Sequence, residues 1–361
     1  MTTQRSALHP VAASQGASFH IRYGWELPAV YTDLSAEYLA ATTGTGLHDS
    51  SYFGRLKAIG ADGLDLLNRL STNKVVDLEP GQGAPTILTT DRGRVLDLIA
   101  VVNLGDHILL ITSPGTQEQV IEFLDKYTIM EDLTVEDVTA ETTMLSVMGP
   151  GSMAALEAVA GTRLTDLPPF HYVSGMVGGC EVRVISRPLG ELPNFDLLVP
   201  PEASGEVWRH LMDSGITPVG GDAFETARVQ YAVPFLGREM GEAYNPLEVG
   251  LIGSIDFAKG CYIGQEVIAR LDTYQKVQKH LVRLQFSPDA VVSEGDSLSN
   301  DGQSVGTVTS VARIPTDGRL VGLGFVRRAS ANAGAHLDLA DPGSGWAEIE
   351  DIPMLFGPGQ D

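Results

Sequence analysis

One of only two cysteines in this chain lies in the stretch KGCYIGQEVIAR, residues 259–270. Cys261 precedes a helix that the spacing of apolar residues predicts over 265–274. At a helix N-terminus, backbone N–H groups and the positive end of the helix dipole favour a thiolate, and Lys259 adds a second positive charge. Two glycines in the stretch permit tight turns and leave room for a ligand or partner to approach the sulfur. The stretch therefore predicts a reactive thiol; the alternative is a small residue packed in a loop.

Other common sites of chemistry are missing from the sequence. It contains no Walker-type phosphate loop, no dinucleotide fingerprint, and no CxxC pair, HExxH or GxSxG motif. The eight histidines occur singly, and a single histidine is more often structural or solvated than catalytic. The second cysteine, Cys180, lies in the alternating stretch CEVRVIS and is expected to be a buried small hydrophobic residue. A metal site or a hydrolase is therefore not favoured.

Charge and composition restrict the partners. The 361 residues include 24 Lys and Arg against 46 Asp and Glu, a formal net charge of −22. Such a chain cannot neutralise phosphates over a broad face, so neither nucleic acid nor a membrane is expected as a partner. A small anionic ligand remains compatible with this charge if a few basic residues gather in one pocket. Two cysteines make no disulfide framework, and no signal peptide or apolar run of membrane length is visible, so a cytoplasmic protein is expected.

The elements that must position these residues point to an α+β fold. Strands over 85–90 and 94–103 flank the turn TDRG and predict a hairpin, which belongs to a small sheet with helices. A second set of strands and helices follows over 144–275, in which FDLLVP alternates as a strand. Beyond Lys279, short strands with turns that contain Gly, Asp and Pro, and no helix, predict an all-β barrel or sandwich.

Several blocks in order resemble one family. KGCYIGQE (259–266, the octet) resembles the signature of YgfZ-type proteins, which are folate-binding relatives of the glycine-cleavage T-protein. LEPGQGAPTILTTDRGRVLDLIA (78–100) is similar to the hairpin of the YgfZ branch, and ETARVQYAVPFLGREM (225–240) to a segment that both branches share. YGWELPAVY (23–31) and GLHDSSYFGRLKAIG (46–60) resemble the opening motifs of the T-protein. The resemblance covers nearly the whole chain.

The resemblance implies a three-domain cloverleaf around a central hole that holds tetrahydrofolate or its formyl or methylene derivative. The implied domains are a central folate-binding α+β domain (1–50 with 141–276), a small ferredoxin-like α+β domain (51–140) and a C-terminal β-barrel (277–361).

The resemblance also implies residues for the two ends of a folate. A pterin presents an edge of N–H donors that a carboxylate accepts in bidentate fashion. Asp196 takes the place of the family's pterin acid, Glu191 is next in line, and the alternative for Asp196 is an edge-strand residue that faces solvent. Arg228 matches an arginine of the shared block and is expected to bind the tail carboxylates, with Arg238 as a weaker candidate and a surface arginine as the alternative.

A third acid is implied near the folate nitrogens, where one-carbon transfer takes place. Asp97 is the candidate for this catalytic position, with the neighbouring position of the family's pattern as the alternative place for it. Its setting among valine, leucine and isoleucine suits it to proton transfer. With Cys261 and Lys259 it completes the set of expected catalytic residues.

The sequence leaves two functions open, and it also leaves open whether the protein catalyses a reaction. The octet favours a YgfZ-type protein that binds a folate and uses Cys261 to support iron–sulfur cluster assembly or repair, with iron–sulfur proteins as partners. The T-protein-like N-terminus favours an aminomethyltransferase, which takes its methylene-amine group from a lipoyl carrier protein. A folate-free scaffold is the third possibility.

Overall fold

The computed structural model describes residues 3–339 and 344–356. The chain forms two compact units that alternate along the sequence. The first holds the residues up to 68, with 74–86 and 98–227, and the second holds 69–73, 87–97 and the residues from 228 onward. Both predicted α+β domains contribute to the first unit, while residues 228–276 group with the barrel in the second. The division into three domains stays a prediction.

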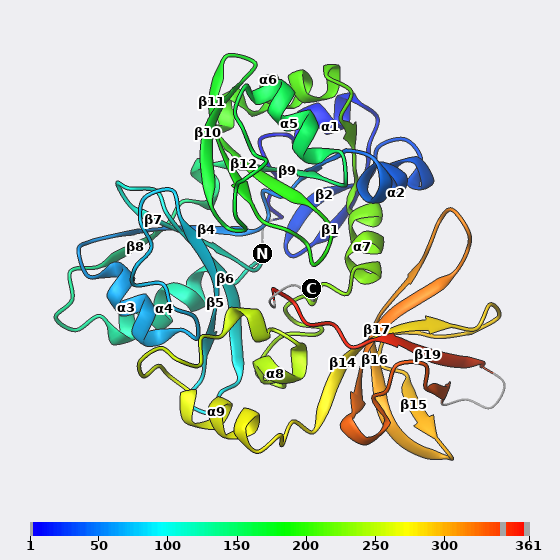
Figure 1. Cartoon of the computed structure of the whole chain (residues 1–361). Coiled ribbons are helices and arrows are strands. Elements are labelled where there is room, and N and C mark those ends of the chain that lie inside the picture. The colour runs from blue at the N-terminus through cyan, green and yellow to red at the C-terminus, as the bar shows by residue number, and fades with distance from the viewer. Residues whose placement is uncertain (1–2, 340–343, 357–361) are drawn as a thin grey trace. The chain divides into compact units, whose positions relative to one another are not determined.

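The first unit contains a six-stranded sheet whose middle strands lie side by side in Figure 1. Its order is β10 (Tyr172–Val177), β11 (Cys180–Ser186), β12 (Asn194–Val199), β9 (Thr143–Met148), β3 (Gly46–Asp49) and β13 (Thr217–Pro218). A separate hairpin pairs β1 (Ser18–Arg22) with β2 (Trp25–Val30).

The helices associated with this sheet and the β1–β2 hairpin are α1 (His9–Ser14), α2 (Leu34–Thr43), α5 (Ser152–Ala160), α6 (Pro201–Asp213) and α7 (Gly221–Gln230), whose last turn begins the second unit. Helices α5 and α6 pack on β10 and β12. Trp208 of α6 and Leu156 of α5 join Leu145 and Leu197 of the strands in one buried cluster. Because side chains alternate along a strand, Ser146 and Asp196 face the other side of the sheet.

A five-stranded sheet completes the first unit. Its order is β5 (Gly83–Thr89), β6 (Val95–Asn103), β7 (Ile108–Thr112), β4 (Gly54–Ile59) and β8 (Thr134–Asp137), and its helices are α3 (Gly63–Leu70) and α4 (Gln117–Tyr127). A short helical turn, η1 (Thr139–Glu141), follows β8. The predicted hairpin is confirmed as β5 and β6, whose turn is closed by the Thr90 N–H, which donates to the Arg94 carbonyl at 2.9 Å. The tip of this hairpin, residues 87–97, belongs to the second unit.

The second unit ends in a closed six-stranded barrel, as predicted. Its order is β14 (Lys279–Phe286), β17 (Leu320–Arg327), β16 (Gln303–Arg313), β15 (Ser297–Asn300), β18 (His336–Leu339) and β19 (Trp346–Asp351), and η3 (Arg328–Ser330) follows β17. Gly322 lets two strands approach, because a Cβ there would lie 2.6 Å from the Ser310 carbonyl oxygen and 2.7 Å from the Phe286 ring.

Short helices precede the barrel: α8 (Pro246–Val249), η2 (Ile252–Ser254) and α9 (Gln265–Thr273). The predicted helix after Cys261 is confirmed as α9, which begins after Gly264. Within 3–339 and 344–356, no helix is both long and apolar enough to cross a membrane.

Candidate functional site

The octet packs against the tip of the β5–β6 hairpin, and both segments belong to the second unit. Gly264 adopts a left-handed φ of +81°, and a Cβ there would lie 2.6 Å from the Thr90 carbonyl oxygen. The hydroxyl of Thr89 donates to the Ile263 carbonyl at 2.6 Å. Gly93 has a left-handed φ of +64°, and a Cβ on it would lie 3.1 Å from a side-chain carbon of Ile268 in α9. The contact therefore leaves no room for a side chain on Gly264 and little room on Gly93.

Hydrogen bonds from Lys259 anchor the other end of the octet. Its ammonium donates to the carbonyl oxygens of Ser71 at 2.8 Å and Asn73 at 2.6 Å. Burial lowers the pKa of Lys259 from 10.5 to about 8, although the nearby Asp256 carboxylate acts in the opposite direction. The Lys259 Nζ also lies 5.4 Å from the ring centroid of Tyr262, whose pKa burial raises to about 12. The lysine predicted to support the thiol thus also anchors the loop that carries it.

Cys261 itself is exposed between these two anchors. Its neighbour Gly260 has open space where a Cβ would stand. The alternative interpretation of Cys261 as a packed small residue is therefore wrong. Cys180 also differs from expectation: it is half-buried rather than buried, because it opens β11 directly after a glycine turn. Burial, followed by neighbouring carboxylates, raises the pKa of the Cys180 thiol.

Asp97 is found on the same hairpin as the residues that contact the octet. It lies on β6 with only 1% of its surface exposed, in agreement with the predicted apolar setting. Two residues before it, the Val95 N–H donates to the Tyr244 carbonyl at 3.0 Å. Asp97 thus lies on the hairpin whose tip contacts the octet.

Arg228 is enclosed by acceptors of the chain, so the alternative of a surface arginine is wrong. Its Nη1 donates to the Val233 carbonyl at 2.7 Å and to Glu239 Oε2 at 3.1 Å, while Nη2 donates to the Ser310 hydroxyl at 2.8 Å. Ser310 in turn donates to Glu239 Oε1 at 2.6 Å. Arg238 is more accessible, with 35% of its side chain exposed and an ion pair to Glu294 at 2.9 Å. Arg238 is the more exposed of the two arginines, and its Nη1 also donates to the buried Ser310 hydroxyl at 3.4 Å.

Asp196 lies in the first unit, at the centre of β12, and its side chain is fully buried. Its Oδ1 accepts from the Ser146 hydroxyl at 2.6 Å and from Asn194 Nδ2 at 3.1 Å, and its Oδ2 accepts from Arg187 Nε. The alternative of an edge-strand residue that faces solvent is therefore wrong. Glu191 is exposed in the turn that leads into β12.

A polar row across three strands was not found by sequence reasoning. Asp196 of β12 is in register with Ser146 of β9, which is in register with His48 of β3. His48 is 3% exposed, and its ring contacts the Val219 carbonyl at 2.9 Å through Nδ1 and the Tyr52 hydroxyl at 3.2 Å through Nε2. Burial lowers the pKa of His48. The signal in the sequence was the block GLHDSSYFG, in which a histidine and an acid stand side by side.

The row holds the Asp196 carboxylate in a fixed position on the sheet face opposite α5 and α6. On this face Phe224 of α7 stacks on the His48 ring, with the ring centroids 4.4 Å apart. Arg187, which binds Asp196, is itself positioned by the Phe53 ring, whose centroid lies 4.8 Å from the guanidinium carbon. Across the described part of the chain, no group of three or more His, Cys, Asp or Glu side chains could hold a metal ion.

Comparisons with known proteins cover both parts of the chain. The family model described as the GCVT N-terminal domain matches residues 8–259, and the one described as the glycine cleavage T-protein C-terminal barrel domain matches residues 279–347.

Among similar proteins, one from Arabidopsis thaliana is named a putative chloroplastic transferase. It is 31% identical over 317 residues, which are 88% of this chain and 72% of that protein. An aminomethyltransferase of Picosynechococcus sp. is 29% identical over 331 residues, 90% of each chain. The crystal structure of the glycine cleavage system aminomethyltransferase T from Bartonella henselae superposes with a TM-score of 0.87 at 20% identity and covers 98% of this chain and 99% of that one. At that identity the superposition shows a shared fold.

Proposed function

Because this chain belongs to the glycine cleavage T-protein family, we propose that it binds a tetrahydrofolate derivative and transfers an aminomethyl group to it from a lipoyl carrier protein. The observation that carries this proposal is similarity to relatives named aminomethyltransferase, which extends over nine-tenths of the chain and includes both the N-terminal domain and the barrel. The buried acids on β6 and β12 are the features of this chain that support it.

In this proposal Asp196 accepts hydrogen bonds from the donor edge of the pterin. The side chains of Ser146 and Arg187 hold the carboxylate rigidly, which reduces the entropy lost on binding. Glu191, at the turn before β12, is the second candidate for this contact. Arg228 and Arg238 are the candidates for the tail carboxylates, and Arg238 is the more exposed of the two.

Asp97 has the role of moving a proton. Bound tetrahydrofolate supplies the two nitrogens between which the carbon is placed, and each nitrogen loses its hydrogen. One of these protons leaves with ammonia and the other with the carrier thiol. A carboxylate that is 1% exposed, held on a hairpin strand, is suited to pass one such proton without exchange with bulk water.

A second candidate function is favoured by a specific observation on the octet. Cys261 is exposed, yet the loop around it is fixed by Lys259 on one side and by Gly264 on the other. Aminomethyl transfer by the residues above assigns this thiol no role. A YgfZ-type function, in which Cys261 supports iron–sulfur cluster assembly or repair and iron–sulfur proteins are partners, assigns it one.

One experiment tests the shared part of both candidates and separates them. The purified chain is titrated with tetrahydrofolate and 5-formyltetrahydrofolate by calorimetry, and aminomethyl transfer is assayed with a lipoylated carrier protein. The first candidate predicts turnover that Asp97→Asn abolishes and Cys261→Ser leaves intact. The second predicts folate binding without turnover, together with a cellular iron–sulfur defect that Cys261→Ser fails to rescue. Absence of binding to either folate would refute both.

A further inference from the structure

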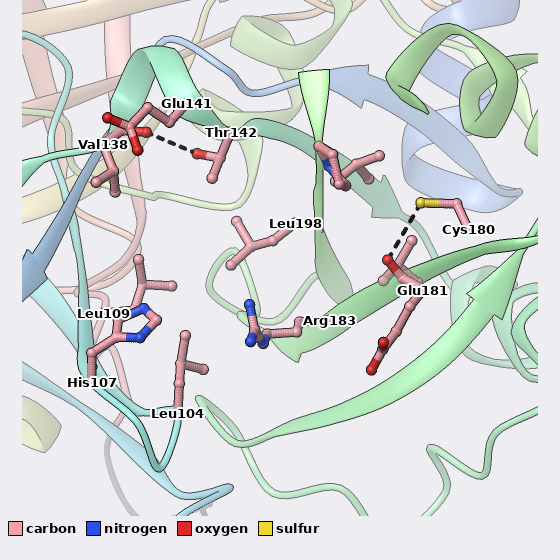
Figure 2. Close-up of a pocket in the computed structure, with 13 residues that line it drawn as sticks. Leu104, His107, Leu109, Val138, Glu141, Thr142, Cys180, Glu181, Arg183 and Leu198 are labelled. Carbon is pink, nitrogen blue, oxygen red and sulfur yellow. Dashed lines mark hydrogen bonds between the residues drawn. The ribbon is translucent and has the colours of Figure 1, made fainter. Parts of the chain in front are cut away.

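The first unit contains a pocket of about 410 Å³ that none of the residues proposed for folate lines. Its walls come from the β6–β7 turn, from the segment around η1, and from the ends of β11 and β12 (Figure 2). The volume lies in the lower part of the range of small-molecule sites, about 300–1,000 Å³. Much of the lining is apolar and buried: Leu104, Leu109, Val138 and Leu198.

Arg183 supplies the charge of this pocket. It stands on β11 in register with Leu198 of β12, and Figure 2 shows its guanidinium among the apolar side chains of the pocket. Among the described residues, its side chain makes neither a hydrogen bond nor an ion pair, although it is half-buried. Arg187, four residues on, is by contrast bound by Asp196. A guanidinium with five N–H donors beside apolar walls is better satisfied by a bound anion than by the chain itself.

The surrounding groups limit the charge of that anion. His107 lines the pocket from the β6–β7 turn, and its Nδ1 lies 3.0 Å from Asp106 Oδ1. Glu141 and Glu181 stand at the rim and are exposed. Three carboxylates beside one pocket repel a doubly charged ligand, whereas a single carboxylate matches the guanidinium fork of Arg183.

We propose that this pocket binds a small monocarboxylic acid with an apolar body. The carboxylate pairs with Arg183, and the apolar body packs against Leu104, Leu109 and Leu198. This site is separate from the proposed folate site in its residues and in the ligand that it selects.

The test uses the full chain and 3-phenylpropionate as the probe. Calorimetry is expected to show saturable binding at one site, while the neutral 3-phenylpropionamide, of the same shape, binds at least about tenfold more weakly because it lacks the charge. Arg183→Gln is expected to reduce the affinity for the acid by about tenfold or more. Arg209→Gln, which removes an exposed arginine of α6 outside the lining, serves as the matched control and leaves binding unchanged.

Alkylation of Cys180 tests where the acid binds, because Cys180 lines the same pocket. In a Cys261→Ser background it is the chain's single thiol, and bound 3-phenylpropionate is expected to slow its alkylation. Saturating tetrahydrofolate, or the Asp196→Asn change, is expected to leave this protection in place, so the result is independent of folate binding. Equal binding of acid and amide, or undiminished binding by Arg183→Gln, would overturn the proposal.

Discussion

Gly93 at the tip of the β5–β6 hairpin and Gly264 of the octet are so close that a Cβ on Gly264 would lie 3.0 Å from the Gly93 Cα. The contact joins two segments that sequence motifs mark separately, and it leaves no room for a side chain on Gly264. The position of the exposed thiol of Cys261 is therefore set by backbone packing.

Gly264→Ala is expected to lower the free energy of unfolding by about 1–3 kcal/mol, because it combines a left-handed φ with overlap against the Thr90 carbonyl. Gly260→Ala is the control within the same octet, since a Cβ there meets nothing within 4 Å. This change is expected to be neutral or to raise the free energy of unfolding by about 0.5 kcal/mol, because alanine reduces the conformational entropy of the unfolded chain. Urea denaturation measures both, and an equal loss in the two variants would contradict the packing argument.

The lowered pKa of Lys259 predicts how the free energy of unfolding changes with pH. Its pKa in the folded chain is about 8, below the ordinary 10.5. Between these values the unfolded chain keeps a proton that the folded chain has released, so the stability of the wild type rises with pH relative to Lys259→Met. Below pH 8 the difference between the two becomes constant. The free energies of unfolding of the wild type and of Lys259→Met, measured at several pH values from 7 to 10.5, test this prediction. Lys126→Met, which removes an exposed ammonium of α4, is the control for the loss of a positive charge. A stability difference between wild type and Lys259→Met that falls as the pH rises would refute the prediction.

Asp196→Asn is expected to weaken tetrahydrofolate binding by more than about tenfold, because the amide places a donor against a donor edge. It also leaves Arg187 without its carboxylate, so stability must be measured alongside affinity. The exposed Glu191 is the matched control, and Glu191→Gln is expected to change affinity less than about twofold. If the Glu191 change has the larger effect in folded protein, the pterin acid is Glu191.

Arg228→Met is expected to lower stability by about 3–5 kcal/mol, because it leaves Glu239 buried without its cation. The double variant Arg228→Met with Glu239→Gln should lose less than the sum of the single changes. Arg238→Met removes a partly exposed ion pair and should lose less than about 1 kcal/mol. Additive losses in the double variant would show that the buried pair is not coupled. Calorimetric titration of Arg238→Met with tetrahydrofolate tests which arginine binds the tail.

Cys261 is expected to react with iodoacetamide at neutral pH at least about tenfold faster than Cys180. The first thiol is exposed, whereas the second is half-buried and has a raised pKa that reduces its thiolate fraction. Peptide mass spectrometry after timed labelling distinguishes the two sites. Cys261→Ser should leave the unfolding midpoint unchanged, and a large shift would mean that the thiol is part of the packing after all.

Local features of the fold were predictable from the sequence. The β5–β6 hairpin was expected at 85–90 and 94–103 and is found at 83–89 and 95–103, because turn chemistry and alternation act over a few residues. The barrel was recognisable for the same reason, since its short strands are separated by turn residues.

The partners of the site residues were not predictable. Lys259 binds a carbonyl 188 residues away, and Arg228 binds a hydroxyl 82 residues away. Such contacts depend on which strands become neighbours, and a single sequence does not specify this. A single histidine such as His48 predicts no site by itself, and its two polar contacts come from Tyr52 and from a carbonyl brought near by the pairing of β13 with β3.

The alternation of the two units along the chain has a consequence for dissection of the protein. A fragment that starts at residue 228 keeps the octet and the barrel but loses 69–73 and 87–97. It therefore lacks the Ser71 and Asn73 carbonyls that anchor Lys259, and the hairpin tip on which Gly264 rests. Expression of the two halves as separate polypeptides is expected to yield a C-terminal piece whose thiol loop is unsupported. A second polypeptide that carries residues 69–73 and 87–97, such as the N-terminal half, is needed to supply these contacts.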